Sequence, residues 1–193
     1  MNTVRPLEST WLLPLHASGH TYDAYLAQDP ARAPKWHEIH ERVTLTENHH
    51  QLLQGFSREM KVFCLSGTWC GDCVQQGPMI EKIAQASPMI DLRWFDRDEF
   101  SELAQAVKIN GGLRVPTVIF CAEDYEPVFV YGDRSLTRYR AAAARNLGPS
   151  CPLPGAPLPQ DELEGTLQDW VDEFERVHLL LRLSARLRQK HQD

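Results

Sequence analysis

The sequence predicts an α/β fold in which a mixed central β-sheet is flanked by helices. Between residues 60 and 120, short apolar strings alternate with segments of helical periodicity, and strands separated by helices pair in parallel. The last two strings are joined only by residues 122–126, which predicts an antiparallel hairpin. Helical patterns occur before, between and after the strands, so helices are expected on both faces of the sheet.

Composition restricts the function. The chain has 193 residues, of which 42% are hydrophobic and 24% charged, as in globular proteins, and its formal net charge is −6. Lysine and arginine do not cluster before the last dozen residues, so we expect no nucleic-acid binding. No apolar run is long enough to span a membrane, and the apolar residues 11–15 are interrupted by Pro14. We therefore expect no signal peptide, no membrane association and a cytoplasmic location.

Residues 1–43 are expected to form a helical extension in which prolines separate short helices. Thr21 is a suitable N-cap for one of them, and residues 35–43 form a second helical pattern. Thr46 can cap a further helix over residues 47–56, where the next domain begins.

Residues 44–147 are expected to form the central domain. Apolar and alternating patterns predict strands at residues 60–65, 89–95, 115–120 and 127–131. Helical patterns predict a helix from the cysteine pair to residue 86, a short helix at 99–107 and a helix ending at 146. Ser135 is the expected cap of the last one, and Pro78 is expected to kink the first.

The C-terminal part divides into a linker and a helix. Residues 148–159 contain five prolines and two glycines, which predicts a stiff extended linker. Residues 160–193 form one long helical pattern with an apolar stripe. We expect this helix to pack on its own domain; burial in a homodimer is the alternative, so the chain is expected to be a monomer or a homodimer.

Two cysteines in a C-x-x-C spacing are the strongest chemical signal. Cys70 and Cys73 follow a predicted buried strand and begin a helix. Free N–H groups and the helix dipole stabilise a thiolate at that position, and the thiolate is the species that attacks a disulfide. Cys70 is therefore the expected nucleophile, and Cys73, one turn later, is the expected resolving thiol.

This region resembles the thioredoxin superfamily. The resemblance rests on the string Trp69-Cys70-Gly71-Asp72-Cys73 after a strand, on Pro78 and on Val115-Pro116-Thr117 at the start of a later strand; Gly132 also fits the family pattern. The segment Tyr22-Asp23-Ala24-Tyr25-Leu26 leading to a W-C-G-D-C site is similar to a bacterial branch of thioredoxin-like proteins. The resemblance implies a thioredoxin-like fold over roughly residues 44–147. It also implies a cis peptide bond before Pro116 and pairing of the Val115 backbone with a substrate polypeptide.

Two positions depart from the family pattern. Asp72 stands where ordinary thioredoxins have proline, and its carboxylate would oppose thiolate formation at Cys70 if it pointed there. Cys64 occupies the position, six residues before the first cysteine, at which thioredoxins bury an aspartate that shuttles a proton. We interpret Cys64 and Cys121 as core residues, and place Cys151 in the linker.

Together these features predict a thiol–disulfide oxidoreductase that reduces protein disulfides through Cys70 and Cys73. Trp69, Gly71, Asp72, Val115 and Pro116 are the expected substrate-binding residues. The expected partners are a disulfide-containing protein and an electron donor, either a reductase or a small thiol, and no cofactor or bound metal is required. The alternatives are a thioredoxin-fold binding module with weak or no redox activity, or a metal-handling C-x-x-C protein.

Overall fold

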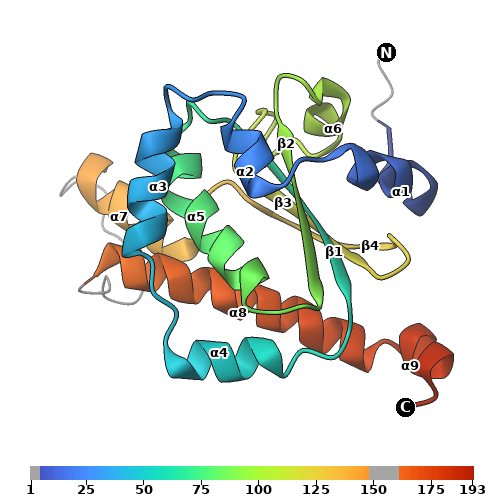
Figure 1. Cartoon of the computed structure of the whole chain (residues 1–193). Helices are drawn as coiled ribbons and strands as arrows, with labels where there is room; N and C mark the ends of the chain where they lie inside the picture. Colours follow the sequence, from blue (N-terminus) through green and yellow to red (C-terminus); the bar gives the residue numbers. More distant parts are fainter. Residues whose placement is uncertain (1–4, 148–160) are drawn as a thin grey trace.

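A computed structural model describes residues 5–147 and 161–193 of the chain and contains one four-stranded sheet (Figure 1). The sheet comprises β1 (Met60–Ser66), β2 (Ile90–Asp96), β3 (Thr117–Ala122) and β4 (Pro127–Gly132), in the order β2-β1-β3-β4. β1 pairs in parallel with β2, whereas β1 with β3 and β3 with β4 pair antiparallel. The predicted mixed sheet and its terminal hairpin are confirmed.

Helices cover both faces of the sheet. Alternation along β1 directs Cys64 and Ser66 to one face and Phe63 to the other. The Cys64 face is covered by α5 (Gly71–Gln85) and α8 (Glu162–Leu183). On the Phe63 face lie α1 (Ser9–Ser18) and α6 (Ser101–Ala106). In Figure 1, α5 lies to the left of the strands and α1 to their right.

The three helices between α1 and β1 pack on the outside of the sheet and of the helices that cover it: the first on β2, the second on α5 and the third on α8. They are α2 (Tyr22–Leu26), α3 (Ala33–Arg42) and α4 (Glu47–Gln54). Thr21 and Thr46 cap α2 and α4 by accepting hydrogen bonds from backbone N–H groups, as predicted. Trp36 of α3 packs so closely on α5 that a Cβ atom at Gly77 would lie 2.2 Å from its indole ring. Glycine therefore sets the distance between α3 and α5.

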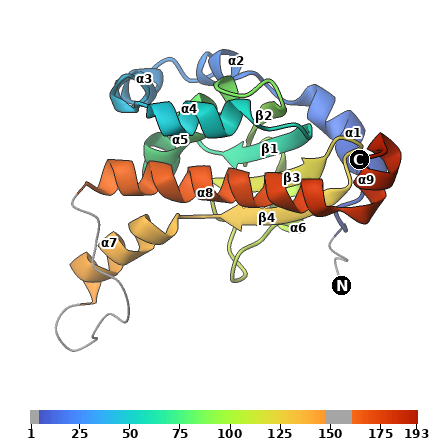
Figure 2. The ribbon, with the colours of Figure 1, turned by 90° about the horizontal axis from the view of Figure 1, so that it is seen from below.

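Two helices follow β4 and differ in their burial. In α7 (Leu136–Asn146) only two residues are buried, and Figure 2 shows this helix extending away from the sheet. The longer α8 lies along the sheet and buries Trp170 and Phe174 completely; the Phe174 ring meets Phe120 of β3 edge-on at 5.1 Å. A helix beyond residue 160 thus supplies much of the core over β3 and β4.

Some elements differ from the sequence-based expectation. The segment containing Pro14 is a helix, α1, which presents His16 to Phe63 at 4.8 Å. The C-terminal pattern forms two helices instead of one, because the backbone at Ser184 is extended between α8 and α9 (Ala185–His191). The turn lets α9 bury Leu187. The proline-rich segment 148–159 lies outside the described residues.

Candidate active site

The cysteine pair lies where β1 leads into α5. Cys70 is the N-cap of α5, with an extended backbone (φ −84°, ψ 122°), and Cys73 lies in its first turn. The Cys70 side chain is partly exposed, whereas Cys73 is 0% exposed, and neither forms a disulfide. The Cys70 thiol can therefore contact an incoming molecule, whereas the Cys73 thiol is covered by the protein.

Their surroundings make the two thiols chemically unequal. A hydrogen bond from the Cys73 thiol, aided by the backbone N–H groups of Cys73 and Asp72, lowers the pKa of Cys70 to about 6. Burial raises the pKa of Cys73 well above its usual range, and the neighbouring Cys70 raises it further. At neutral pH Cys70 is thus mainly a thiolate and Cys73 a thiol, so Cys70 is the better nucleophile.

A cis-proline segment lies beside Cys70. The Val115–Pro116 bond is cis, as the sequence predicted, and the carbonyl oxygen of Val115 is 3.6 Å from Sγ of Cys70. Gly132 packs against this segment, and its φ is +154°. A Cβ atom at Gly132 would lie 2.4 Å from the Pro116 carbonyl oxygen. Only glycine fits at this position.

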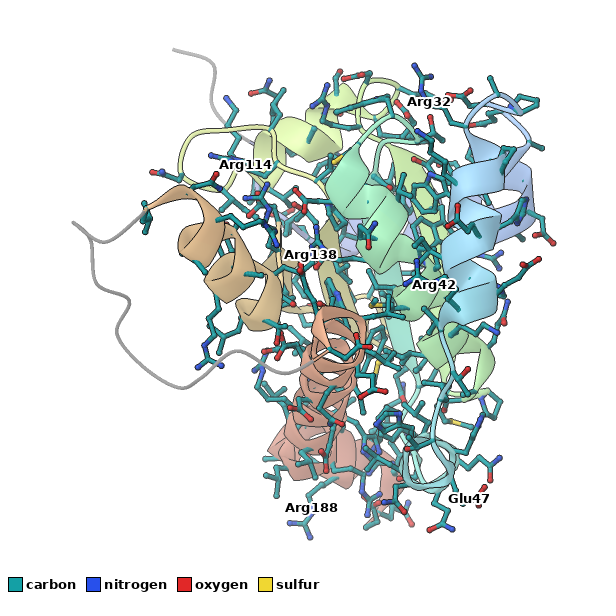
Figure 3. All side chains as sticks on the ribbon, turned by 90° about the vertical axis from the view of Figure 1, so that its left-hand side faces the viewer. Arg32, Arg42, Glu47, Arg114, Arg138 and Arg188 are labelled. Atoms are coloured by element: carbon teal, nitrogen blue, oxygen red, sulfur yellow. The ribbon has the colours of Figure 1, made fainter. Side chains whose placement is uncertain are left out.

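The Asp72 carboxylate is paired with two arginines. Its Oδ2 accepts a hydrogen bond from Nε of Arg134 at 2.8 Å, and its Oδ1 accepts one from Nη2 of Arg138 at 2.7 Å. Burial opposes ionisation, but these guanidinium groups lower the pKa of Asp72. Figure 3 shows Arg138 between α7 and α5. Because two cations neutralise this carboxylate, it opposes the Cys70 thiolate only weakly.

Trp69 offers an exposed aromatic surface next to the nucleophile. Its side chain is 43% exposed, and the guanidinium of Arg97 stacks 4.4 Å from the ring centroid. The ring also lies over Gly67, where a Cβ atom would come within 2.6 Å of it. The loop and Arg97 thus hold the indole in one orientation beside Cys70.

The N-terminal extension supports the loop before Cys70. The Thr68 hydroxyl donates to Asp29 at 2.7 Å, and the Thr68 carbonyl accepts from Nε1 of Trp36 at 3.2 Å. From the sequence, residues 1–43 are expected to be an extension of the central domain. In the structure, α3 and the segment before it hold the backbone next to the reactive thiol.

Gln76 is a central residue that sequence reasoning missed. It is completely buried; its Nε2 donates to the carbonyl oxygens of Asp72 and Asp133, and its Oε1 accepts from the Ser135 N–H and from Nε1 of Trp170. The side chain therefore joins α5, the segment after β4 and α8. A polar residue on an amphipathic helix is normally solvent-facing, so only its three-residue spacing from Cys73 could have signalled this role.

The remaining cysteines do not belong to the reactive pair. Cys64 and Cys121 are completely buried, and burial raises the pKa of each thiol. Cys151 falls outside the described residues. Within residues 5–147 and 161–193, no group of three or more His, Cys, Asp or Glu side chains is arranged to hold a metal ion. In the same ranges no helix is long and apolar enough to cross a membrane.

Sequence comparisons relate this chain to thioredoxins. A family model described as "Thioredoxin" matches residues 19–143. Thioredoxin-1 of Saccharomyces cerevisiae is 32% identical over 77 residues, which are 40% of this chain and 72% of the yeast protein. "Putative thioredoxin 2" of Streptomyces coelicolor is 40% identical over 55 residues, which are 28% of this chain and 39% of that protein.

A comparison with solved structures extends the similarity of fold beyond the part matched in sequence. A protein of unknown function from Pseudomonas aeruginosa superposes with a TM-score of 0.62 at 16% identity, covering 84% of this chain and 96% of its own. At that identity the likeness concerns the fold alone.

Proposed function

This chain belongs to the thioredoxin family, and on that premise we propose that it is a thiol–disulfide oxidoreductase that reduces protein disulfides through Cys70 and Cys73. The observation that carries the proposal is the inequality of the two thiols. A partly exposed Cys70 with a pKa of about 6 lies one helical turn from a fully buried Cys73. An attacking thiolate and a protected resolving thiol are what dithiol exchange requires.

The proposed reaction has two exchange steps. The Cys70 thiolate attacks one sulfur of the substrate disulfide, which forms a mixed disulfide and releases the other sulfur as a thiolate. Cys73 then loses its proton and attacks Sγ of Cys70; the second substrate sulfur leaves, and a Cys70–Cys73 disulfide remains. Two electrons have passed to the substrate, whose two thiolates take up protons. A reductase or a small thiol then restores the dithiol.

The proposed substrate contacts surround Cys70. Trp69 offers apolar area, and Val115 lies against Sγ of Cys70, where its backbone can pair with an extended peptide. Gly71 is exposed at the start of α5, and a Cβ atom there would meet nothing within 4 Å, so this side is open. Pro116 sets the direction of the Val115 carbonyl, and Asp72 holds the adjoining surface through its arginine pairs.

Trapping of the mixed disulfide tests this function. We expect Cys73→Ser to accumulate a covalent adduct with a disulfide-containing protein such as insulin, because the resolving thiol is missing. Cys70→Ser is the matched control and should form no adduct, because Cys73 is buried. Equal trapping by both variants, or by neither, would contradict the assigned roles.

A further inference from the structure

The resolving step requires a negative charge on a buried sulfur, and neither cysteine of the pair stabilises that charge. Cys73 must become a thiolate to attack the mixed disulfide, yet burial raises its pKa. Linking Cys70 to a substrate removes the charge that raises this pKa further, but the effect of burial, which is the largest, remains. The anion that forms on Cys73 therefore needs another stabilising group inside the protein.

Two buried hydroxyl groups near the start of α5 have no hydrogen-bond partner in the described part of the chain. Ser66 ends β1 on the face covered by α5, and its side chain is completely buried, as is that of Tyr25 from α2. Within the described part of the chain neither hydroxyl has a partner at hydrogen-bond distance. Such buried, unsatisfied groups are uncommon because each one costs stability.

The Ser66 hydroxyl acts on both Cys73 and Tyr25. Ser66 and Cys73 are both completely buried where β1 leads into α5, and the Ser66 hydroxyl counteracts the effect of burial on the pKa of that thiol. The same hydroxyl acts in the same direction on Tyr25, whose pKa burial raises. Ser66 is therefore a neighbour that the thiol and the phenol share.

Packing fixes the Tyr25 ring. It stacks on Trp94 at a centroid distance of 5.6 Å and meets Trp36 edge-on at 5.9 Å. A ring held in this way directs its hydroxyl to one place, so the phenol needs little reorganisation when charge develops nearby.

We propose that the Ser66 hydroxyl is a catalytic hydrogen-bond donor to the Cys73 thiolate during resolution, and that Tyr25 is a positioning residue that donates to Ser66. This inference rests on the proposed function and deepens it. The Cys73 proton ends on the departing substrate thiolate, directly or through solvent. Cys73 forms the new S–S bond as the Cys70–substrate S–S bond breaks, and both hydroxyl groups keep their own protons throughout.

The chain contains a matched control for the tyrosine. Tyr22 is also buried, also lies beside Trp36 and Trp94, and its hydroxyl likewise lacks a partner. The charges that act on it, however, are Glu81 and Asp23, not the cysteines. Tyr22→Phe and Tyr25→Phe therefore remove the same atom from similar packing, but only one of these atoms adjoins Ser66.

The test follows the reaction of the reduced protein with 5,5′-dithiobis(2-nitrobenzoate) by stopped flow. Attack by Cys70 releases the first coloured thiolate, and resolution by Cys73 releases the second. We expect Tyr25→Phe and Ser66→Ala to leave the first phase unchanged and to slow the second about 3- to 10-fold. A raised Cys73 pKa reduces the thiolate fraction but partly restores its nucleophilicity, which limits the effect.

The pH profile separates a chemical role from a structural one. The second phase should reach its midpoint at higher pH in both variants, whereas Tyr22→Phe should match the wild type and Ser66→Thr should restore the wild-type profile. Other titratable groups in this cluster are Cys70, Cys64 and Asp96, none of which is changed.

Two results would overturn the inference. They are an unchanged second phase in Tyr25→Phe and Ser66→Ala, or equal slowing in Tyr22→Phe. A wild-type protein that shows no second phase would instead contradict the proposed function itself.

Discussion

Replacing Gly77 with alanine tests how tightly the N-terminal extension is joined to the catalytic helix. The new Cβ atom would lie 2.2 Å from Cζ3 and 2.8 Å from Cη2 of Trp36. Trp36 cannot move aside cheaply, because it is completely buried among the rings of Tyr22, Tyr25 and Trp94.

The magnitude follows from opposing contributions. Alanine improves helix propensity by about 1 kcal/mol. Overpacking costs about 1–3 kcal/mol or more, and displacement of Trp36 breaks its hydrogen bond to the Thr68 carbonyl, a loss of about 1 kcal/mol. We therefore expect Gly77→Ala to lower the free energy of unfolding by about 1–3 kcal/mol.

Urea unfolding of the reduced protein, followed by tryptophan fluorescence, measures this change. Gly71→Ala is the control: it lies in the same helix, nothing is within 4 Å of its Cβ position, and it should be neutral or slightly stabilising. If Gly77→Ala were as stable as Gly71→Ala, the close packing of α3 on α5 would be refuted.

Four further predictions concern the site. Alkylation of Cys70 should rise through a midpoint near pH 6, and a midpoint at 8 or above would contradict the assigned environment. The pKa of Cys70 lies below the ordinary value of 9.0, so the folded protein favours the thiolate. This preference stabilises the reduced fold fully above about pH 9, and the contribution disappears as the pH falls through 6. The free energies of unfolding of Cys70→Ser and wild type, measured in urea, should therefore differ most at alkaline pH. Asp72→Asn removes an anion and releases Arg134 and Arg138, so the Cys70 pKa should fall; a rise in the alkylation midpoint would show that the carboxylate supports the thiolate. Trp69→Ala should raise KM for a protein disulfide about 3- to 10-fold while leaving the rate with a small disulfide unchanged, and equal effects on both would exclude a role in peptide contact.

Local patterns account for what could be predicted from the sequence. The helix caps at Thr21, Thr46 and Ser135 depend on residues three positions away, and all three form. Strand–helix alternation predicts the order of elements along the chain and the parallel pairing of β1 with β2, but not the antiparallel direction of β3 after α6. The cis bond before Pro116 came from a family resemblance and is confirmed.

Long-range partners account for what could not be predicted. The direction of Asp72 depends on arginines 62 and 66 residues away, and the role of Gln76 depends on Trp170, 94 residues away. The proximity of Tyr25 to Ser66 likewise arises from packing of α2 against the sheet, which no local periodicity reports. Such contacts follow from tertiary packing, so propensity and spacing do not encode them.

The most direct test of the central claim is a redox titration of the Cys70–Cys73 couple. The protein is equilibrated anaerobically with glutathione buffers, its thiols are alkylated, and the modified residues are identified by mass spectrometry. We predict a reversible two-electron transition to an intramolecular disulfide with a midpoint near about −270 mV, as for a reductant. A midpoint near about −120 mV would contradict the reductive direction, and absence of any Cys70–Cys73 disulfide would contradict the proposed function altogether.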